Sequence, residues 1–299
     1  MEIALRAARA RYQDIGIYAG PALCLLMLWI GPQGGLDDPA WRTAAVGTWM
    51  AVWWATEARP VGVTAFIPLI LFAPLGITTM KSAAAHYANP IIYLYLGGFL
   101  IALAMQRWDL HKRIALKLLT VSGTNGRSLV GGFMLTAALL SMWMTNTSTT
   151  MMLLPIVSSV IAVIADTVKE IGDKERRNFS LCLLLGTAFG ATIGGVATLV
   201  GTPPNAFLAA FLADNYGIEI SFARWMRVGV PVTVIMLPLC WLLLTRLVYP
   251  ISFQTSQETR DLLQRLKAGL GPASSAERRV GIIFLCVVAG WMTRPWLSK

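Results

Sequence analysis

The chain has 299 residues, of which 56% are hydrophobic and 13% charged, and it carries a formal net charge of +10. Soluble domains carry about a quarter charged residues, so the composition excludes an ordinary soluble protein. The basic residues lie in short segments between apolar runs, which is typical of the cytoplasmic loops of an all-α polytopic membrane protein and disfavours nucleic acid as a partner.

Apolar runs follow one another along the whole chain, and several reach the ~20 residues needed to cross a hydrocarbon core. They lie near residues 15–30, 43–56, 61–75, 89–106, 128–165, 179–213, 228–248 and 280–293. Between the fourth and fifth runs, residues 107–120 interleave Lys and Arg with apolar side chains. This pattern predicts a basic amphipathic helix on the cytoplasmic surface, with His111 solvated.

Charge distribution also predicts a topology. If the N-terminus is cytoplasmic, most of the 25 Lys and Arg residues fall on the inside, as the positive-inside rule requires. The apolar block at 128–165 has basic segments on both sides, so it must cross an even number of times. This predicts a helical hairpin over 127–166 with its tip at "TNTSTT", residues 145–150. Charge alone does not distinguish a hairpin that spans the membrane from a re-entrant one, but the polar tip favours the re-entrant form.

Two stretches interrupt the apolar pattern with uncharged polar or flexible residues. The first is the predicted hairpin tip, and the second is "GATIGGVATLVGTPPNAF", residues 190–207, where glycines and a Pro-Pro pair should break the helix. Freed carbonyls and hydroxyls suit a hard cation such as sodium, while helix N-termini attract anions. No Asp, Glu, Lys, Arg or His lies deep inside a predicted span, which disfavours a proton relay and an intramembrane enzyme.

At these residues the chain resembles the divalent anion–sodium symporter family, which includes sodium-dependent dicarboxylate, citrate and sulfate transporters. The resemblance is carried by "SMWMTNTSTTMMLLPI" and "IGGVATLVGTPPNAF". The family's Ser-Asn-Thr signature matches Thr145, Asn146 and Thr147, with Thr in place of Ser. The resemblance implies a sodium site and an overlapping substrate site, with sodium as the coupling ion and no other cofactor. The sodium ligands would be Ser141, Thr145, Asn146, Gly194 and Gly195, and the substrate contacts would be Asn146, Thr147 and Thr198.

The resemblance also implies a domain layout, a homodimer in a bacterial inner membrane and an elevator-type mechanism. The family has two inverted repeats after an initial helix, so this chain would hold the initial helix, the first repeat and part of the second. We expect scaffold helices in 1–126, half of a transport domain in 127–250, a cytoplasmic loop in 251–279 and the first helix of an incomplete second repeat in 280–299. Within 127–250 we expect the hairpin, a broken helix at 179–214 and a further helix at 224–249.

Sodium-coupled symport of C4-dicarboxylates is the function that these features favour. Two alternatives stay open at this point. One is a sodium-independent anion exchanger or channel, and the other is a non-transporting fragment that pairs with a full-length subunit.

Overall fold

The computed structural model describes residues 10–121, 125–168, 172–254 and 257–297. In these ranges the regular elements are helices, and the β-structure is an isolated bridge between Asn125 and Gln254. Five segments are long and apolar enough to cross a membrane: Arg11–Ile30, Met80–Arg107, Asn146–Thr167, Asp173–Val196 and Phe222–Val248. The predicted all-α polytopic membrane fold is confirmed.

Contacts divide the chain into two compact units, Met1–Asn89 and Pro90–Lys299. The described helices of the first unit are α1 (Arg11–Ile30), α2 (Asp38–Ala55), α3 (Val61–Ala65), α4 (Ile67–Leu71) and α5 (Met80–Tyr87). α1 and α2 pack closely because α1 has glycines where α2 has bulky side chains. A Cβ on Gly20 would lie 2.8 Å from Trp49 and 2.9 Å from Trp53. The indole of Trp41 also donates to the Met27 carbonyl at 2.7 Å.

The apolar run at 61–75 does not form one continuous helix but the two short helices α3 and α4. Pro68 has no N–H to donate to the carbonyl four residues earlier, so an uninterrupted helix loses a hydrogen bond there. The amide of Phe66 instead donates to Val63 at 3.2 Å, which tightens the turn between the two helices.

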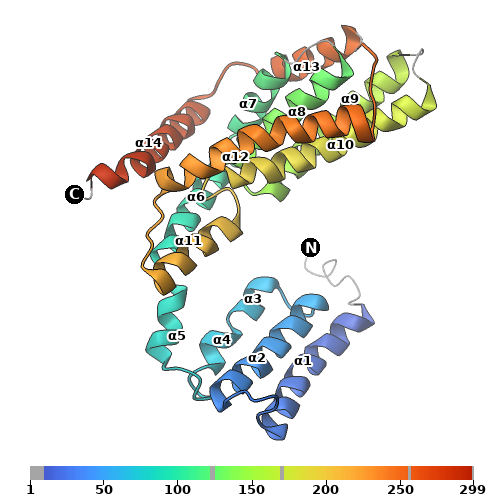
Figure 1. Cartoon of the computed structure of the whole chain (residues 1–299). Helices are drawn as coiled ribbons and strands as arrows, with labels where there is room; N and C mark the ends of the chain where they lie inside the picture. Colours follow the sequence, from blue (N-terminus) through green and yellow to red (C-terminus); the bar gives the residue numbers. More distant parts are fainter. Residues whose placement is uncertain (1–9, 122–124, 169–171, 255–256, 298–299) are drawn as a thin grey trace. The chain divides into compact units, whose positions relative to one another are not determined.

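The second unit contains the remaining helices, and Figure 1 shows α8, α9, α10 and α12 running alongside one another. Its elements are α6 (Pro90–Arg107), α7 (Leu110–Leu119), α8 (Gly126–Ser141), α9 (Asn146–Thr167), α10 (Asp173–Val196), α11 (Pro203–Tyr216), α12 (Phe222–Leu242) with its π-helical continuation Leu243–Val248, α13 (Gln257–Gly269) and α14 (Ser275–Leu297). α8 and α10 make the most extensive helix–helix contact. Phe133, Val160 and Leu183 are fully buried in the main core cluster.

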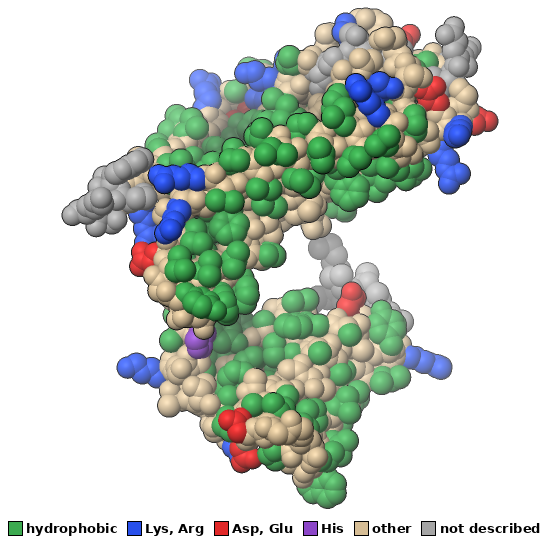
Figure 2. Space-filling view, in the orientation of Figure 1, with side chains coloured by type: hydrophobic (Ala, Val, Ile, Leu, Met, Phe, Trp, Pro, Cys, Tyr) green, Lys and Arg blue, Asp and Glu red, His purple; other side chains and the backbone are tan. Residues whose placement is uncertain are grey.

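Hydrophobic side chains are exposed along the helices over much of the surface visible in Figure 2. Many of them are large and solvent-accessible in the isolated chain, such as Leu247 at 72% and Ile235 at 65% exposed. A monomer in water does not normally leave so much apolar surface uncovered. The surface therefore fits a lipid environment.

The amphipathic helix predicted at 107–120 corresponds to α7, but His111 is not solvated as expected. Its side chain is only 4% exposed, and its Nδ1 atom lies 2.8 Å from the Met105 carbonyl. Asp109 has a left-handed backbone conformation (φ 55°) that turns the chain sharply between α6 and α7. The turn places His111 against the end of α6, where burial lowers its pKa.

Arg113 on α7 binds the segment that leads into α14. Its guanidinium donates to both carboxylate oxygens of Glu277, at 3.1 and 3.2 Å, and to the carbonyls of Leu270 and Gly271 at 3.2 and 2.9 Å. Glu277 also accepts from the amide of Ser274 at 2.6 Å, which completes a capping box at the start of α14. These hydrogen bonds lower the pKa of the Glu277 carboxyl, with Arg113 the main cause.

The contribution of Glu277 to stability should depend on pH. Because its pKa is lowered in the folded state, the contribution is complete above the unfolded carboxyl pKa of about 4.3 and is lost as pH falls through the folded value. At pH 7, Glu277→Gln should lower the midpoint of thermal unfolding by about 2–4 °C, and the difference from wild type should disappear in acid. The exposed Glu219 provides the control, since Glu219→Gln should have little effect at either pH. An equal deficit at both pH values would contradict the ion-pair explanation.

Candidate functional site

The predicted hairpin tip, residues 145–150, begins at the turn between α8 and α9. α8 ends at Ser141, and α9 starts at Asn146 with Thr145 as its N-cap. The Thr145 hydroxyl accepts from the amide of Ser148 at 3.2 Å and donates to the Ser148 hydroxyl at 2.8 Å. Thr145 therefore ends the turn as a capping residue, which is the role that the Ser/Thr preference at N-caps predicts.

Ser141 and Asn146 meet across this turn. The Ser141 hydroxyl donates to the Asn146 amide oxygen at 2.6 Å. Ser141 is fully buried, Asn146 is partly buried, and Thr147 beside it is exposed. The turn thus brings together two uncharged oxygen atoms and leaves a further hydroxyl, that of Thr147, accessible.

The second polar stretch forms a helix break at residues 197–202. α10 ends at Val196, and α11 begins at Pro203 with Pro204 after it, which suits proline because the first turn of a helix needs no donor. Thr198 in the break is buried, and its hydroxyl donates to the Met142 carbonyl in the hairpin turn. This hydrogen bond connects the break directly to the hairpin.

The glycines of α10 have two different environments. Gly186, Gly190 and Gly194, which we term the glycine seam, recur every fourth residue and so lie on one face of α10. A Cβ on Gly190 would lie 2.6 Å from the Met134 carbonyl oxygen, and one on Gly194 would overlap the backbone of Ala138. The seam therefore allows α8 and α10 to approach at backbone distance.

Gly195 faces the hairpin tip instead of the seam. A Cβ at this position would lie 2.5 Å from the Asn146 amide oxygen, and Gly201 packs against the Gly195 carbonyl. The hairpin tip and the helix break therefore meet at Asn146 and Gly195. Of the predicted site residues, Ser141, Asn146 and Gly195 adjoin one another, whereas Gly194 packs on α8 and Thr198 bonds the hairpin turn.

Sequence reasoning did not single out Asn205, Trp225 or Thr233, although each donates a hydrogen bond to a carbonyl in the last turn of α10. Asn205 is 7% exposed and donates from one amide nitrogen to two carbonyls of the break region. The indole of Trp225 donates to Val196 at 2.9 Å, and the Thr233 hydroxyl donates to Ile193 at 3.1 Å. The sequence signal for Asn205 was its position directly after the Pro-Pro pair. A polar side chain that follows a helix break lies close to the carbonyls that the break leaves free.

The chemistry of this region is that of neutral oxygen atoms. In the described ranges no group of three or more His, Cys, Asp or Glu residues could hold a metal ion. The hydroxyl of Thr149 is fully buried and has no hydrogen-bond partner among the described residues. The N-terminus of α9 also points its partial positive charge at the tip. The neutral oxygen atoms fit a hard monovalent cation better than a transition metal, whereas the helix terminus favours an anion.

A cavity of about 210 Å³ lies elsewhere, near the C-terminal end of α9. Its lining residues come from α9 and α13: Val163, Asp166, Thr167, Glu258, Leu262 and Arg265. It is roughly 30 Å along α9 from the hairpin tip at 1.5 Å per residue, so it is separate from the site.

Comparison with known proteins agrees with the resemblance carried by the two motifs. The family model described as the sodium:sulfate symporter transmembrane region matches residues 17–298. The chain is 36% identical over 290 residues to the sodium-dependent dicarboxylate transporter SdcS of Staphylococcus saprophyticus, covering 96% of this chain and 56% of that protein. It is 36% identical over 300 residues to SdcS of Staphylococcus aureus strain USA300, covering 96% of this chain and 55% of the relative.

The chain thus spans about half the length of the curated relatives it matches. The family match extends over both polar stretches and over the apolar helices that flank them. The predicted family relationship is confirmed, and the apolar helices agree with an integral membrane protein. The chain belongs to the family defined by the sodium:sulfate symporter transmembrane region.

Proposed function

We propose that the protein containing this chain is a sodium-coupled symporter of divalent anions, and specifically of C4-dicarboxylates. The observation that carries the proposal is the meeting of Ser141, Asn146 and Gly195 where a hairpin tip adjoins a helix break. Non-helical backbone at membrane depth is tolerated where it lines a protein-enclosed site, and transporters place substrate and ion sites there.

Sodium would bind the oxygen atoms of Ser141 and Asn146, with Thr145 and the backbone of Gly194 and Gly195 completing the predicted ligand set. In the structure the Ser141 hydroxyl donates to Asn146, so its hydrogen must turn away before both oxygens can face a cation. Because the ligands are neutral, the bound ion keeps its full positive charge. That charge can then hold one carboxylate of the substrate.

The substrate would lie on the exposed side of the tip. Thr147 is exposed and Asn146 is partly exposed, so both can donate to a carboxylate, and the N-terminus of α9 favours negative charge at the same place. Thr198 would act through its hydrogen bond to the hairpin turn. The name of the two Staphylococcus relatives, sodium-dependent dicarboxylate transporter, supports a dicarboxylate as the anion.

The remaining parts of the proposal follow from the family and from charge. We propose a homodimer in a bacterial inner membrane, with a cytoplasmic N-terminus and an elevator-type motion. Labelling of single cysteines placed in the segments before α1 and between α12 and α14 would test the orientation.

The test is uptake of radiolabelled succinate into proteoliposomes that contain the full gene product. Replacement of sodium by choline should abolish concentrative uptake. An inward sodium gradient should drive accumulation, and the initial rate should saturate with sodium concentration. Empty liposomes are the control. Uptake that is equal in choline and in sodium would refute coupling and would favour an anion exchanger or channel.

A further inference from the structure

Each carbonyl that the C-terminal end of α10 leaves free accepts a hydrogen bond. A helix leaves its last four carbonyls without intrahelical partners, and for α10 these are Ile193, Gly194, Gly195 and Val196. The donors are the Thr233 hydroxyl, the Ala197 amide, the Asn205 side-chain amide and the Trp225 indole, at 2.9–3.1 Å. The break is therefore held in one conformation by donors from α11, α12 and its own first residue.

Asn205 differs from the other donors because it binds one carbonyl in the last turn of α10 and a second carbonyl in the break. Its amide nitrogen donates to Gly195 at 3.0 Å and to Thr198 at 2.8 Å, which uses both of its hydrogens. Both acceptor residues contact the hairpin. Gly195 lies against the Asn146 amide oxygen, and the Thr198 hydroxyl donates to the Met142 carbonyl.

The geometry points to Asn205 as a positioning residue for the cation site, an inference that rests on the proposed sodium-coupled function. By holding Gly195 and Thr198 at a fixed separation, Asn205 sets the distance between the break backbone and Asn146. The size of the cation that fits between them is therefore set partly by a side chain that does not bind it. Asparagine suits this role because its amide offers two donors without a charge, whereas Lys or Arg would place a positive charge beside the cation.

Asn205→Asp provides the sharpest test, because it keeps the size of the side chain and replaces both donor hydrogens with an acceptor. In the full gene product, reconstituted in proteoliposomes, the sodium concentration that gives half-maximal succinate uptake should rise about tenfold or more. The maximal rate at saturating sodium should change much less. The ratio of the half-saturating concentrations of lithium and sodium should also change, since a purely structural defect would lower the amount of active protein without altering cation preference.

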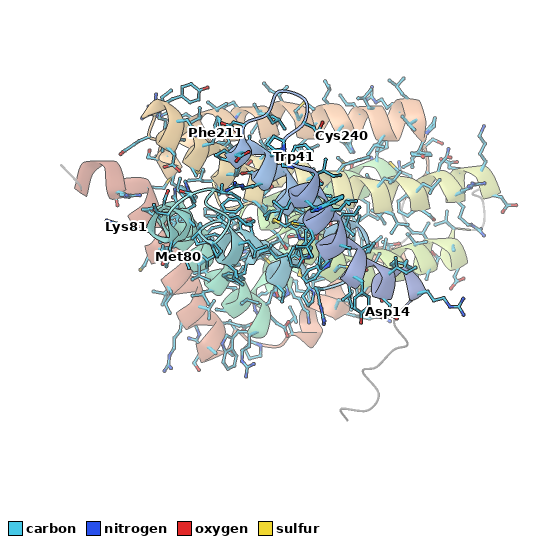
Figure 3. All side chains as sticks on the ribbon, turned by 90° about the horizontal axis from the view of Figure 1, so that it is seen from below. Asp14, Trp41, Met80, Lys81, Phe211 and Cys240 are labelled. Carbon is cyan, nitrogen blue, oxygen red and sulfur yellow. The ribbon has the colours of Figure 1, made fainter. Side chains whose placement is uncertain are left out.

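Asn215→Asp is the matched control. Asn215 lies on the same helix, and its amide also donates to a backbone carbonyl, that of Phe211 at 2.9 Å, but it is exposed. Figure 3 labels Phe211 on α11. The control should keep the wild-type sodium dependence and the wild-type lithium-to-sodium ratio. Asn205→Ala, which removes both donors without adding a charge, should reproduce the shift seen with Asn205→Asp.

The outcomes separate this inference from the proposed function. Sodium-independent uptake by the wild type would refute the proposed function itself. Sodium-dependent wild-type uptake, with both Asn205 variants folded and unchanged in sodium affinity and cation ratio, would overturn only the positioning role. If neither variant elutes as monodisperse protein while Asn215→Asp does, Asn205 serves folding alone and the inference also fails.

Discussion

Gly194→Ala should lower the midpoint of thermal unfolding by about 5–10 °C, because the new methyl group has no space between α10 and α8. It would overlap the carbonyl oxygen and the Cα of Ala138, which are backbone atoms that cannot rotate away. Overpacking a tight core costs about 1–3 kcal/mol and more where backbone must move, and each 1 kcal/mol corresponds to about 2–4 °C in a chain of this size. The midpoint can be followed by circular dichroism of the detergent-solubilised protein.

Gly97→Ala is the control for this substitution. Gly97 lies within α6, and a Cβ there would have none of the described residues within 4 Å. Alanine has the higher helix propensity, so this variant should be as stable as the wild type or slightly more stable. Equal midpoints for the two variants would contradict close backbone packing at the seam.

Asn146→Ala should reduce sodium-driven succinate uptake about 10–100-fold at subsaturating sodium. Asn146 is the residue that the proposed sodium and substrate sites share. Its amide oxygen accepts a hydrogen bond from the Ser141 hydroxyl and lies against Gly195. Loss of one hydrogen bond or ligand interaction to a charged group costs about 1.5–3 kcal/mol, and 1.4 kcal/mol is tenfold in affinity. Half-saturating concentrations of both sodium and succinate should therefore rise.

Asn178→Ala controls for the loss of an asparagine amide in the same unit. Its amide donates to the Pro250 carbonyl at 3.3 Å in an exposed position, so transport should remain close to wild type. Near-wild-type affinity for both sodium and succinate in Asn146→Ala would refute the assignment of this residue.

The helical class and the two polar stretches could be predicted from the sequence because each depends on local patterns. Long apolar runs require helices in a bilayer, and "TNTSTT" between basic flanks predicts a turn. Thr145 then caps α9, and Pro203 and Pro204 occupy the first turn of α11. These are positions where the preferences of single residues determine the backbone.

What could not be predicted depends on contacts between distant segments. Gly194 and Gly195 are neighbours in one motif, yet one packs on Ala138 and the other faces Asn146, because adjacent residues on a helix point about 100° apart. Burial of His111 depends on the left-handed turn at Asp109, which is rare for a non-glycine residue. The role of Asn205 required the positions of carbonyls from another helix.

Backbone contact along the glycine seam limits how this part of the protein can move. A helix that packs through side chains can slide, because rotamers adjust, whereas Gly190 and Gly194 place α10 directly against the α8 backbone. The Thr198–Met142 hydrogen bond joins the ends of the same two elements. The two halves of the candidate site should therefore move as one rigid body, and any exchange of access between the sides of the membrane must occur at surfaces outside the seam.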